Sequence, residues 1–225
     1  MINQLLGALP KEELDRLSPY FRQTQLRSKQ ALLRQGEPVQ HVIFPSGGVC
    51  SFVKTMGNGQ SIEVMSVGGE GVIGACVVLG QAESATDVIV QIPDHAALSL
   101  HLDIFKSAVE EGGALAASVT AYYSTFARHL MQASACNALH LAEQRCCRWL
   151  LTTDERVKGA GFLFTHDMLA ATLGLRRPTV TFILTELQRA GIVEYARGAL
   201  LKVLDRRAVE AKACECYRAL SPSLG

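Results

Sequence analysis

The stretch THDMLAATLGLRRPTVTFILTELQRAGIVEYARGALLKVLD, residues 165–205, carries the strongest structural pattern in the chain. Thr165 is a residue type that caps helix N-termini, and Asp167 places an acidic charge in the first turn, where it is favoured. Gly174 adopts the left-handed turn that ends a helix at little cost. We therefore predict a short helix over 165–173. Its buried residues are expected to be Leu169, Ala170 and Leu173.

A second helix is predicted immediately afterwards, with Pro178 in its first turn, where a missing N–H costs nothing. Gly191 ends this helix, and two strand-like runs follow, IVEY and LLKVLD, with Gly198 at the turn between them. This order of helix, glycine turn, helix and β-hairpin is that of a winged helix-turn-helix. The inner face of the second helix is expected to be Val180, Ile183, Leu184 and Leu187.

A turn this short makes the two helices cross, so the second helix is exposed and can enter a DNA major groove. Arginine can bond both acceptors of guanine, and threonine can bond phosphate or touch a thymine methyl group. We therefore predict a DNA-binding surface. Its expected residues are Thr165, Arg176, Arg177, Thr179, Thr181, Arg189, Arg197 and Lys202. The alternative is a winged helix that contacts only protein, but packing does not require two adjacent arginines.

The charge distribution favours an anionic partner at the C-terminal end. The net charge is +1, but residues 1–158 have 13 Lys/Arg against 15 Asp/Glu, whereas residues 159–225 have nine against six. Hydrophobic residues make up 48% and charged residues 19%, which is typical of a globular protein. No apolar run is long enough to span a bilayer and no signal peptide is recognised, so we expect a cytoplasmic protein without a membrane partner.

The region from 24 to about 102 has a different pattern. Short runs rich in Val, Ile and Phe alternate with Gly and Pro, and GNG at 57–59 separates two of them as a hairpin turn would. Seven or eight such runs without intervening helices predict an antiparallel β-barrel or jelly roll, preceded by a helical lead-in over 2–22. With the C-terminal helices this gives an α+β fold.

Helical periodicity returns at 114–135 and again at about 139–157. The first of these helices has an apolar stripe, which favours pairing with a second copy of the chain; packing against its own barrel is the alternative. The expected dimerisation residues are Val119, Tyr122, Tyr123, Phe126 and Leu130. The predicted domains are a sensor over 1–112, a dimerisation helix over 113–137 and a DNA-binding domain over 138–225, with KGAG at 158–161 as a linker.

This combination resembles the Crp/Fnr family of bacterial transcription regulators, over nearly the whole chain and most specifically at 165–205. The resemblance implies a homodimeric, sequence-specific DNA-binding regulator with a cyclic-nucleotide-binding-like sensor domain. It implies double-stranded DNA, a second copy and RNA polymerase as candidate partners. Arg177 matches the family's base-reading arginine. Pro178 stands where the family often has a cytosine-reading Glu and Phe182 where a second Arg is common, so a different operator sequence is expected. The alternative function is a ligand-binding regulatory module whose winged helix contacts protein.

Glycines at 69, 71 and 74 have the G-x-G-x-x-G spacing of dinucleotide-binding loops. No helical pattern follows and no βαβ unit surrounds them, so we reject a dinucleotide site. In the family this position is the phosphate-binding cassette of the effector pocket. The candidate pocket residues are Gly69, Glu70, Gly71, Gly74, Ala75, Glu83 and Ser84.

The candidate pocket lacks the cation that a cyclic phosphate requires. Glu83 stands where the cyclic-AMP binders have an arginine, and the segment 55–105 contains six acidic residues but no Lys or Arg. Without a charged donor, the desolvation of a phosphate is not repaid. We therefore predict that cyclic AMP is not the effector, and the sequence names no other one.

The remaining sensor and enzyme classes have weak signals. Seven scattered cysteines, without C-x-x-C, are expected to be mostly buried thiols. A weak pattern for a redox or metal site is formed by the pairs Cys146-Cys147 and Cys214-x-Cys216. Thiol sensing by Cys136, Cys146 or Cys147 is a further hypothesis. We expect no metal and no cofactor. No catalytic motif stands out, so we expect no enzyme.

Overall fold

The computed structural model describes residues 3–196 and 199–220. The chain forms two compact units, the first made of residues 1–55 and 66–127 and the second of residues 56–65 and 128–225. The boundary between them falls inside α4 (Ala114–Leu139), the helix that the sequence predicts over 114–135. Among the described residues, no helix is both long and apolar enough to cross a bilayer.

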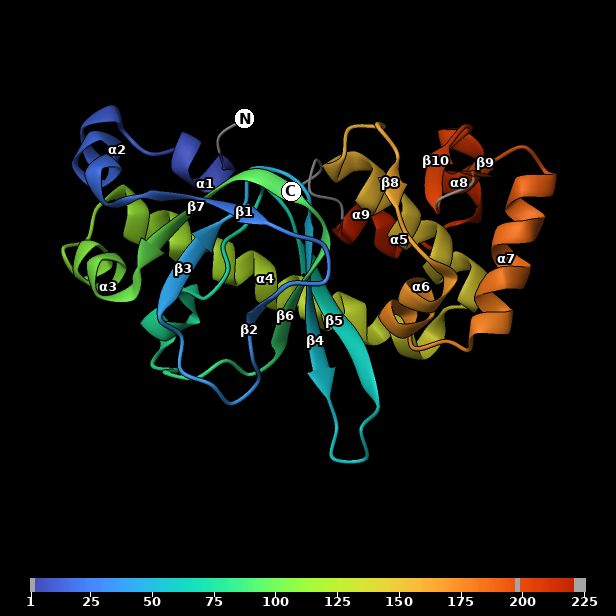
Figure 1. The fold of residues 1–225 in the computed structure, drawn as a ribbon, viewed down its shortest axis with the longest axis horizontal. Coiled ribbons are helices and arrows are strands. Elements are labelled where there is room, and N and C mark those ends of the chain that lie inside the picture. Colours follow the sequence, from blue (N-terminus) through green and yellow to red (C-terminus); the bar gives the residue numbers. More distant parts are fainter. Residues whose placement is uncertain (1–2, 197–198, 221–225) are drawn as a thin grey trace. The chain divides into compact units, whose positions relative to one another are not determined.

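The β-strands of the N-terminal region form two sheets, which confirms the predicted antiparallel β architecture (Figure 1). One sheet has the order β1-β7-β3 and the other the order β2-β6-β4-β5. β1 and β3 pair antiparallel with β7, and β2 and β4 pair antiparallel with β6. The strands are β1 (Arg22–Leu26), β2 (Ala31–Leu33), β3 (His41–Phe44), β4 (Val49–Thr55), β5 (Ser61–Val67), β6 (Asp87–Ile92) and β7 (Asp94–His101).

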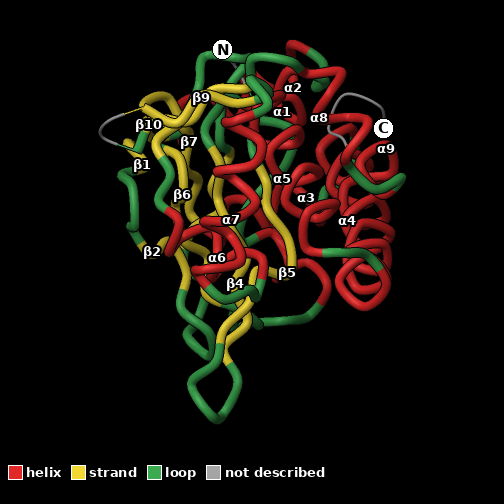
Figure 2. The backbone as a smooth tube through the Cα atoms, turned by 90° about the vertical axis from the view of Figure 1, so that its right-hand side faces the viewer, coloured by secondary structure: helices red, strands yellow, loops and turns green. Residues whose placement is uncertain are grey.

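The alternation of side chains along β3 shows how the first unit builds its core. Ile43 packs with Val88 and Val90 of the opposite sheet, so the two sheets lie face to face. Val42 and Phe44 point the other way, because neighbouring strand residues face opposite sides, and they enter a second cluster formed with the helices. Figure 2 shows β1, β6 and β7 on one side of this unit and α3 and α4 on the other.

Two polar side chains fix helix starts in the first unit. The Asn3 side-chain oxygen accepts from the N–H groups of Leu5 and Leu6, and its Nδ2 donates to carbonyls of the loops that follow β3 and β5. The Glu13 carboxylate accepts from the N–H groups of Ala114 and Leu115 at 3.0 and 2.8 Å. An anion is stabilised at a helix N-terminus, so Glu13 caps α4. The helices here are α1 (Gln4–Gly7), α2 (Lys11–Leu17), the 3-10 turn η1 (Ser18–Tyr20) and α3 (Leu102–Glu110).

Close packing explains why the loop after β5 contains glycines. A side-chain carbon at Gly71 would lie 2.1 Å from the Val67 methyl Cγ2, and one at Gly74 would lie 2.7 Å from the His41 carbonyl oxygen. Gly74 also has φ +83°, a conformation that favours glycine. Only a short 3-10 turn, η2 (Ala75–Leu79), follows it. The neighbouring strands are antiparallel, so the structure agrees with the rejection of a dinucleotide fold.

The second unit contains the predicted winged helix-turn-helix. The predicted helix over 139–157 is α5 (Ala142–Arg156). Its Trp149 ring packs against Phe164 in a tilted contact with centroids 4.5 Å apart and against Phe162 edge-on at 5.8 Å. A three-stranded sheet of order β8-β10-β9 forms the wing side. The remaining elements are α6 (His166–Leu173), α7 (Arg177–Arg189), β8 (Phe162–Leu163), β9 (Val193–Ala196), β10 (Leu200–Val203), α8 (Arg206–Lys212) and α9 (Cys216–Leu220).

The apolar stripe of α4 does not lie on one continuous free surface. Val119 is 1% exposed and belongs to the core of the first unit, and Tyr122 and Tyr123 pack against that core. Phe126 contacts the Phe52 ring at 5.4 Å. These four predicted dimerisation residues therefore pack within their own unit, as in the alternative that we described. Leu130 is half-buried.

Exposed apolar side chains appear instead in the C-terminal half of α4. Met131 and Leu139 are 73% and 79% exposed. Together with smaller side chains of the same helix they form an open apolar face in the second unit. The residues of this face are Leu130, Met131, Ser134, Ala135, Ala138 and Leu139.

His166 joins three elements of the second unit. Its Nδ1 lies 2.9 Å from Thr181 Oγ1 of α7, and its ring stacks 4.9 Å from Tyr195 of β9. Its Nε2 is buried without a hydrogen-bond partner among the described residues. Burial and the charge of Arg177 lower the pKa of His166 below its ordinary value of 6.5, against the opposing charge of Asp167.

The lowered pKa means that the folded chain binds a proton at His166 less readily than the unfolded chain does. Stability contributed by the neutral ring is therefore present above pH 6.5 and is lost as the pH falls below it. We expect the melting temperature of the wild type to fall more steeply than that of His166→Gln between about pH 7 and about pH 5. Calorimetric scans at matched pH measure this, and parallel curves for the two proteins would contradict it.

Candidate nucleic-acid interface

Helix α6 begins and ends as the sequence indicates. Thr165 Oγ1 accepts from the Met168 N–H at 3.2 Å, and Gly174 follows the last turn in the left-handed conformation with φ +62°. The Leu175 N–H then bonds back to the Ala170 carbonyl at 2.9 Å, which satisfies one of the helix-end acceptors. A buried arginine of α5, Arg145, donates to the Leu173 carbonyl. The turn between α6 and α7 is therefore fixed by its own backbone hydrogen bond and by a side chain of α5.

Helix α7 buries the face predicted for it. Arg176 is the N-cap residue and Pro178 lies in the first turn, where no N–H is needed. The helix packs on α5 and α6. Four residues form its buried face: Val180, Ile183, Leu184 and Leu187.

The opposite face of α7 presents cationic, hydroxyl and aromatic groups to solvent. Arg176, Arg177 and Thr179 are all exposed, and Phe182 is 67% exposed. Arg177 Nε lies 3.3 Å from Asp167 Oδ1, with both side chains about two-thirds exposed. Such an ion pair is screened by water and contributes little. Arg177 can therefore leave Asp167 for a stronger acceptor.

Three predicted contacts have structural partners. Thr165 caps α6, and Thr181 is half-buried and bonded to His166. Arg189 pairs with Glu186 at 2.7 Å on the solvent side of α7. Sequence reasoning could not assign the bond between Thr181 and His166, because the two residues lie on different helices that only the turn brings together.

The wing carries one cation among the described residues. β9 and β10 pair antiparallel, with Lys202 opposite Glu194, and Lys202 is exposed. Tyr195 donates from its hydroxyl to the Phe164 carbonyl at 3.0 Å, which anchors β9 to the rest of the second unit. The predicted contact Arg197 and the turn residue Gly198 lie outside the described residues.

Several of the candidate effector residues form hydrogen bonds with nearby backbone groups. Gly69, Gly71, Gly74 and Ala75 lie in the loop after β5, and Ala75 is fully buried. Glu70 accepts from the Gly68 N–H at 3.0 Å.

The second part of the candidate pocket lies in the segment before β6. Ser84 is buried and donates to the Thr86 carbonyl at 2.7 Å, whereas Glu83 is exposed and forms a β-bridge with Pro38. The segment 55–105 itself contains no Lys or Arg. Beside it, Lys54 of β4 donates from Nζ to the Ala85 carbonyl at 2.8 Å and is therefore already bonded to backbone.

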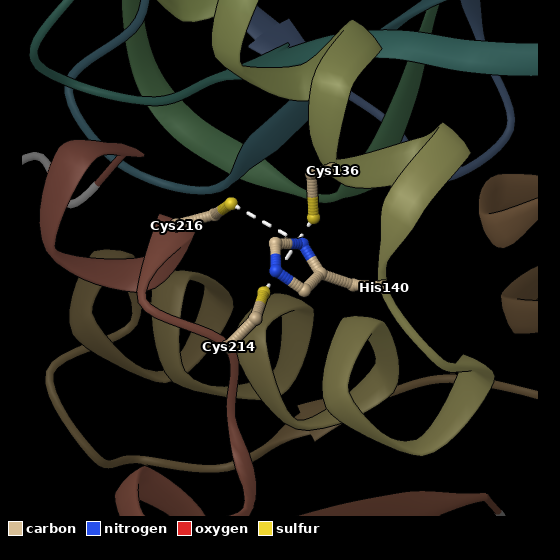
Figure 3. Close-up of side chains that lie close together, drawn as sticks. All are labelled: Cys136, His140, Cys214 and Cys216. Carbon is tan, nitrogen blue, oxygen red and sulfur yellow. Dashed lines mark hydrogen bonds between the residues drawn. The ribbon is translucent and has the colours of Figure 1, made fainter.

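The cysteines form a grouping that differs from the one that the sequence suggests. Cys146 and Cys147 are buried in α5, and burial raises the pKa of both thiols, that of Cys147 to about 12, so they are poor redox sensors. Cys214 and Cys216 meet Cys136 and His140 instead (Figure 3).

The four side chains of this grouping point toward one another, and their ligand atoms all lie within 4.8 Å (Figure 3). Burial alone would raise the pKa of Cys136, but the charge of Arg148 and hydrogen bonds from neighbouring groups outweigh burial and lower it. The available sequence signal was the Cys136-x-x-x-His140 spacing, which places two ligands on one helix face. We refer to this group as the Cys3His cluster.

Comparison with known proteins agrees with this architecture. The family described as Crp-like helix-turn-helix domain matches residues 144–212. No curated protein matches the sequence of the chain.

Solved structures resemble the chain over most of its length. FixK2 from Bradyrhizobium japonicum has a TM-score of 0.73 at 17% identity, covering 86% of this chain and 98% of its own. A putative Crp/Fnr-family regulator from Eubacterium rectale has a TM-score of 0.69 at 16% identity, covering 92% and 96%. The c-di-GMP responsive regulator CLP from Xanthomonas campestris has a TM-score of 0.67 at 13% identity, covering 86% and 99%. Residues 144–212 are therefore a Crp-like helix-turn-helix domain, and the chain has the fold of the Crp/Fnr family of transcription regulators.

Proposed function

We propose that this protein is a homodimeric transcription regulator that binds double-stranded DNA in a sequence-specific manner. The observation that carries the proposal is the exposed face of α7, which displays Arg176, Arg177, Thr179 and Phe182 while the opposite face is buried. No catalytic role is proposed, and the cytoplasm is the expected location.

The chemistry of this face suits base recognition. The guanidinium of Arg177 can donate two hydrogen bonds to guanine O6 and N7, and the Phe182 ring can contact a thymine methyl group. Arg176 and Lys202, both exposed, can neutralise phosphates without reading sequence. Pro178 and Phe182 replace residues that the resemblance expects to read bases, so the operator should differ from that of the best-known family members.

A homodimer would place two such helices on half-sites about 34 Å apart, one turn of the duplex. The exposed apolar face on the C-terminal half of α4, with Met131 and Leu139, supports an interface between copies. RNA polymerase, as a candidate partner of a DNA-bound regulator, belongs to the same proposal.

Cyclic AMP is not the effector in this proposal. Segment 55–105 has no Lys or Arg. The neighbouring Lys54 already donates to the Ala85 carbonyl, and Ser84 donates to the Thr86 carbonyl. CLP, a structural relative, is described as c-di-GMP responsive, which shows that the fold serves effectors other than cyclic AMP. The effector of this protein is unassigned.

Removal of the Arg177 side chain tests the DNA-binding role. The wild type is first used to select an operator from random DNA, and affinity is then measured by fluorescence anisotropy. We expect Arg177→Ala to lower specific affinity by about 1–3 kcal/mol and to relax selectivity at one base pair. Arg22→Ala, which removes an exposed arginine of β1, should leave specific affinity unchanged.

The alternative is a winged helix that contacts protein. A wild type that binds no duplex DNA even at low salt would favour that alternative over DNA recognition. Equal loss of affinity in Arg177→Ala and Arg22→Ala would argue against base reading at Arg177.

The exposed apolar face of α4 predicts where the dimer can be broken. We expect the wild type to sediment as a dimer and the double variant Met131→Glu/Leu139→Glu to sediment as a monomer, because two carboxylates would be desolvated at the interface. Leu79→Glu, at an exposed apolar residue of η2, is the matched control and should remain dimeric. A monomeric wild type at micromolar concentration would refute the dimer.

Titration calorimetry tests the effector proposal. We expect no heat of binding when cyclic AMP or cyclic GMP is added to the full chain, since the phosphate would lose its hydration without gaining an ionic partner. Saturable binding of either nucleotide at micromolar concentration would overturn it.

A further inference from the structure

We propose that the Cys3His cluster binds a single zinc(II) ion. Its ligands come from two segments of the second unit. Cys136 lies in the last turn of α4 and His140 just after it, whereas Cys214 precedes α9 and Cys216 is the first residue of α9. The site goes beyond the proposed function and does not depend on DNA binding. Three thiolates and one imidazole are a ligand set found in closed, four-coordinate zinc sites.

The spacing of the ligand atoms fits one metal ion. Cys136 Sγ lies 3.5 Å from Cys214 Sγ, and Cys216 Sγ lies 3.5 Å from His140 Nδ1. A tetrahedral zinc with bonds of about 2.3 Å to sulfur and about 2.0 Å to nitrogen holds its ligand atoms slightly less than 4 Å apart. The cluster therefore needs only small side-chain movements to accept the ion. An iron–sulfur cluster would need its ligands further apart, because its own iron and sulfide atoms lie between them.

The groups around the ligands have the arrangement that zinc sites use. His140 turns Nδ1 toward the sulfurs, and its other nitrogen, Nε2, lies 3.2 Å from the Glu215 carboxylate. A carboxylate behind a ligating histidine fixes the tautomer and orientation of the ring. Gln132 Nε2 donates to Cys216 Sγ at 3.0 Å, a contact that a metal-bound thiolate would keep. A simple packing cluster of thiols would require neither contact.

The charge of the site is also compensated. Three thiolates and one zinc ion carry a net charge of −1. Arg148 of α5 lies close enough to Cys136 for its positive charge to act on that thiol. Arg148 also has a buried Nε without a hydrogen-bond partner among the described residues. Arg148 can therefore offset the remaining negative charge.

The local backbone explains why these residues converge. The His140 N–H bonds to the Cys136 carbonyl at 3.1 Å, so the helical turn continues and both side chains project from one face. Cys214 and Cys216 flank Glu215 just after the extended residue Ala213. The metal would cross-link positions 78 residues apart, Cys136 and Cys214. Such a link adds metal-binding free energy to the folding of the second unit.

A disulfide between Cys136 and Cys214 is the competing explanation, because their sulfurs are close. That bond would use two of the four groups and would leave unexplained why His140 and Cys216 complete the set. Copper(I) is a second competitor for soft thiolates, although imidazole and four ligands suit zinc.

The test uses the full chain, purified under reducing conditions. Metal content is measured by mass spectrometry, and cobalt(II) is added to the metal-free protein as a spectroscopic probe. We expect one zinc per chain, the visible absorption of tetrahedral thiolate-bound cobalt, and displacement of cobalt by zinc. Removing zinc should lower the melting temperature, and restoring it should recover the original value.

Variants separate the ligands from general effects of cysteine loss. Cys136→Ser and Cys216→Ser should lose stoichiometric zinc, whereas Cys76→Ser, in the first unit, should keep it. Glu215→Gln should keep the cobalt spectrum but weaken zinc affinity by about 10- to 100-fold. This last variant leaves every ligand in place, so it remains informative if a cysteine variant fails to fold.

Three outcomes would overturn the site. They are a reduced wild type that binds neither zinc nor cobalt, ligand variants that bind as well as the wild type, and copper(I) that remains bound in the presence of excess zinc. A Cys136–Cys214 disulfide in a protein that takes up no metal would favour the redox explanation. None of these measurements involves DNA, so failure of the zinc site and failure of the proposed regulator can be distinguished.

Discussion

The burial of one face of α7 is the constraint on which the DNA-binding surface depends. Each large apolar side chain of that face contributes about 1.5–3 kcal/mol when it leaves water. Because a helix has two faces and one must be buried, the residues between the buried positions are forced outward. Arg176, Arg177 and Phe182 are therefore exposed as a consequence of where Val180 and Ile183 are buried.

The turn before α7 makes this burial possible without strain. Gly174 supplies a left-handed residue, and Pro178 lies in the first turn of α7, where a missing N–H leaves no bond unmade. The Thr181–His166 bond and the Arg145 contact to the Leu173 carbonyl then fix α6 relative to its neighbours. Polar groups thus specify the crossing of the helices, while apolar burial supplies most of the stabilisation.

Helix α4 serves two environments. Its N-terminal half is capped by Glu13 and packs in the core of the first unit through Leu115 and Val119. Its C-terminal half exposes Met131 and Leu139 on one side and directs Cys136 into the Cys3His cluster on another. One continuous helix therefore carries a core, a candidate interface and a candidate metal site, which explains why its apolar stripe does not form one continuous free surface.

Short-range patterns in the sequence determined the winged helix-turn-helix and the antiparallel strands, because caps, glycine turns and alternation act over a few residues. The four buried positions of α7 followed from helical spacing alone. The features that depend on contacts between distant segments were decided by the tertiary structure. They are the burial of Val119, the bond between Thr181 and His166, and the meeting of Cys136 and His140 with Cys214 and Cys216. Contacts across 78 residues depend on how helices pack, and no local periodicity encodes that.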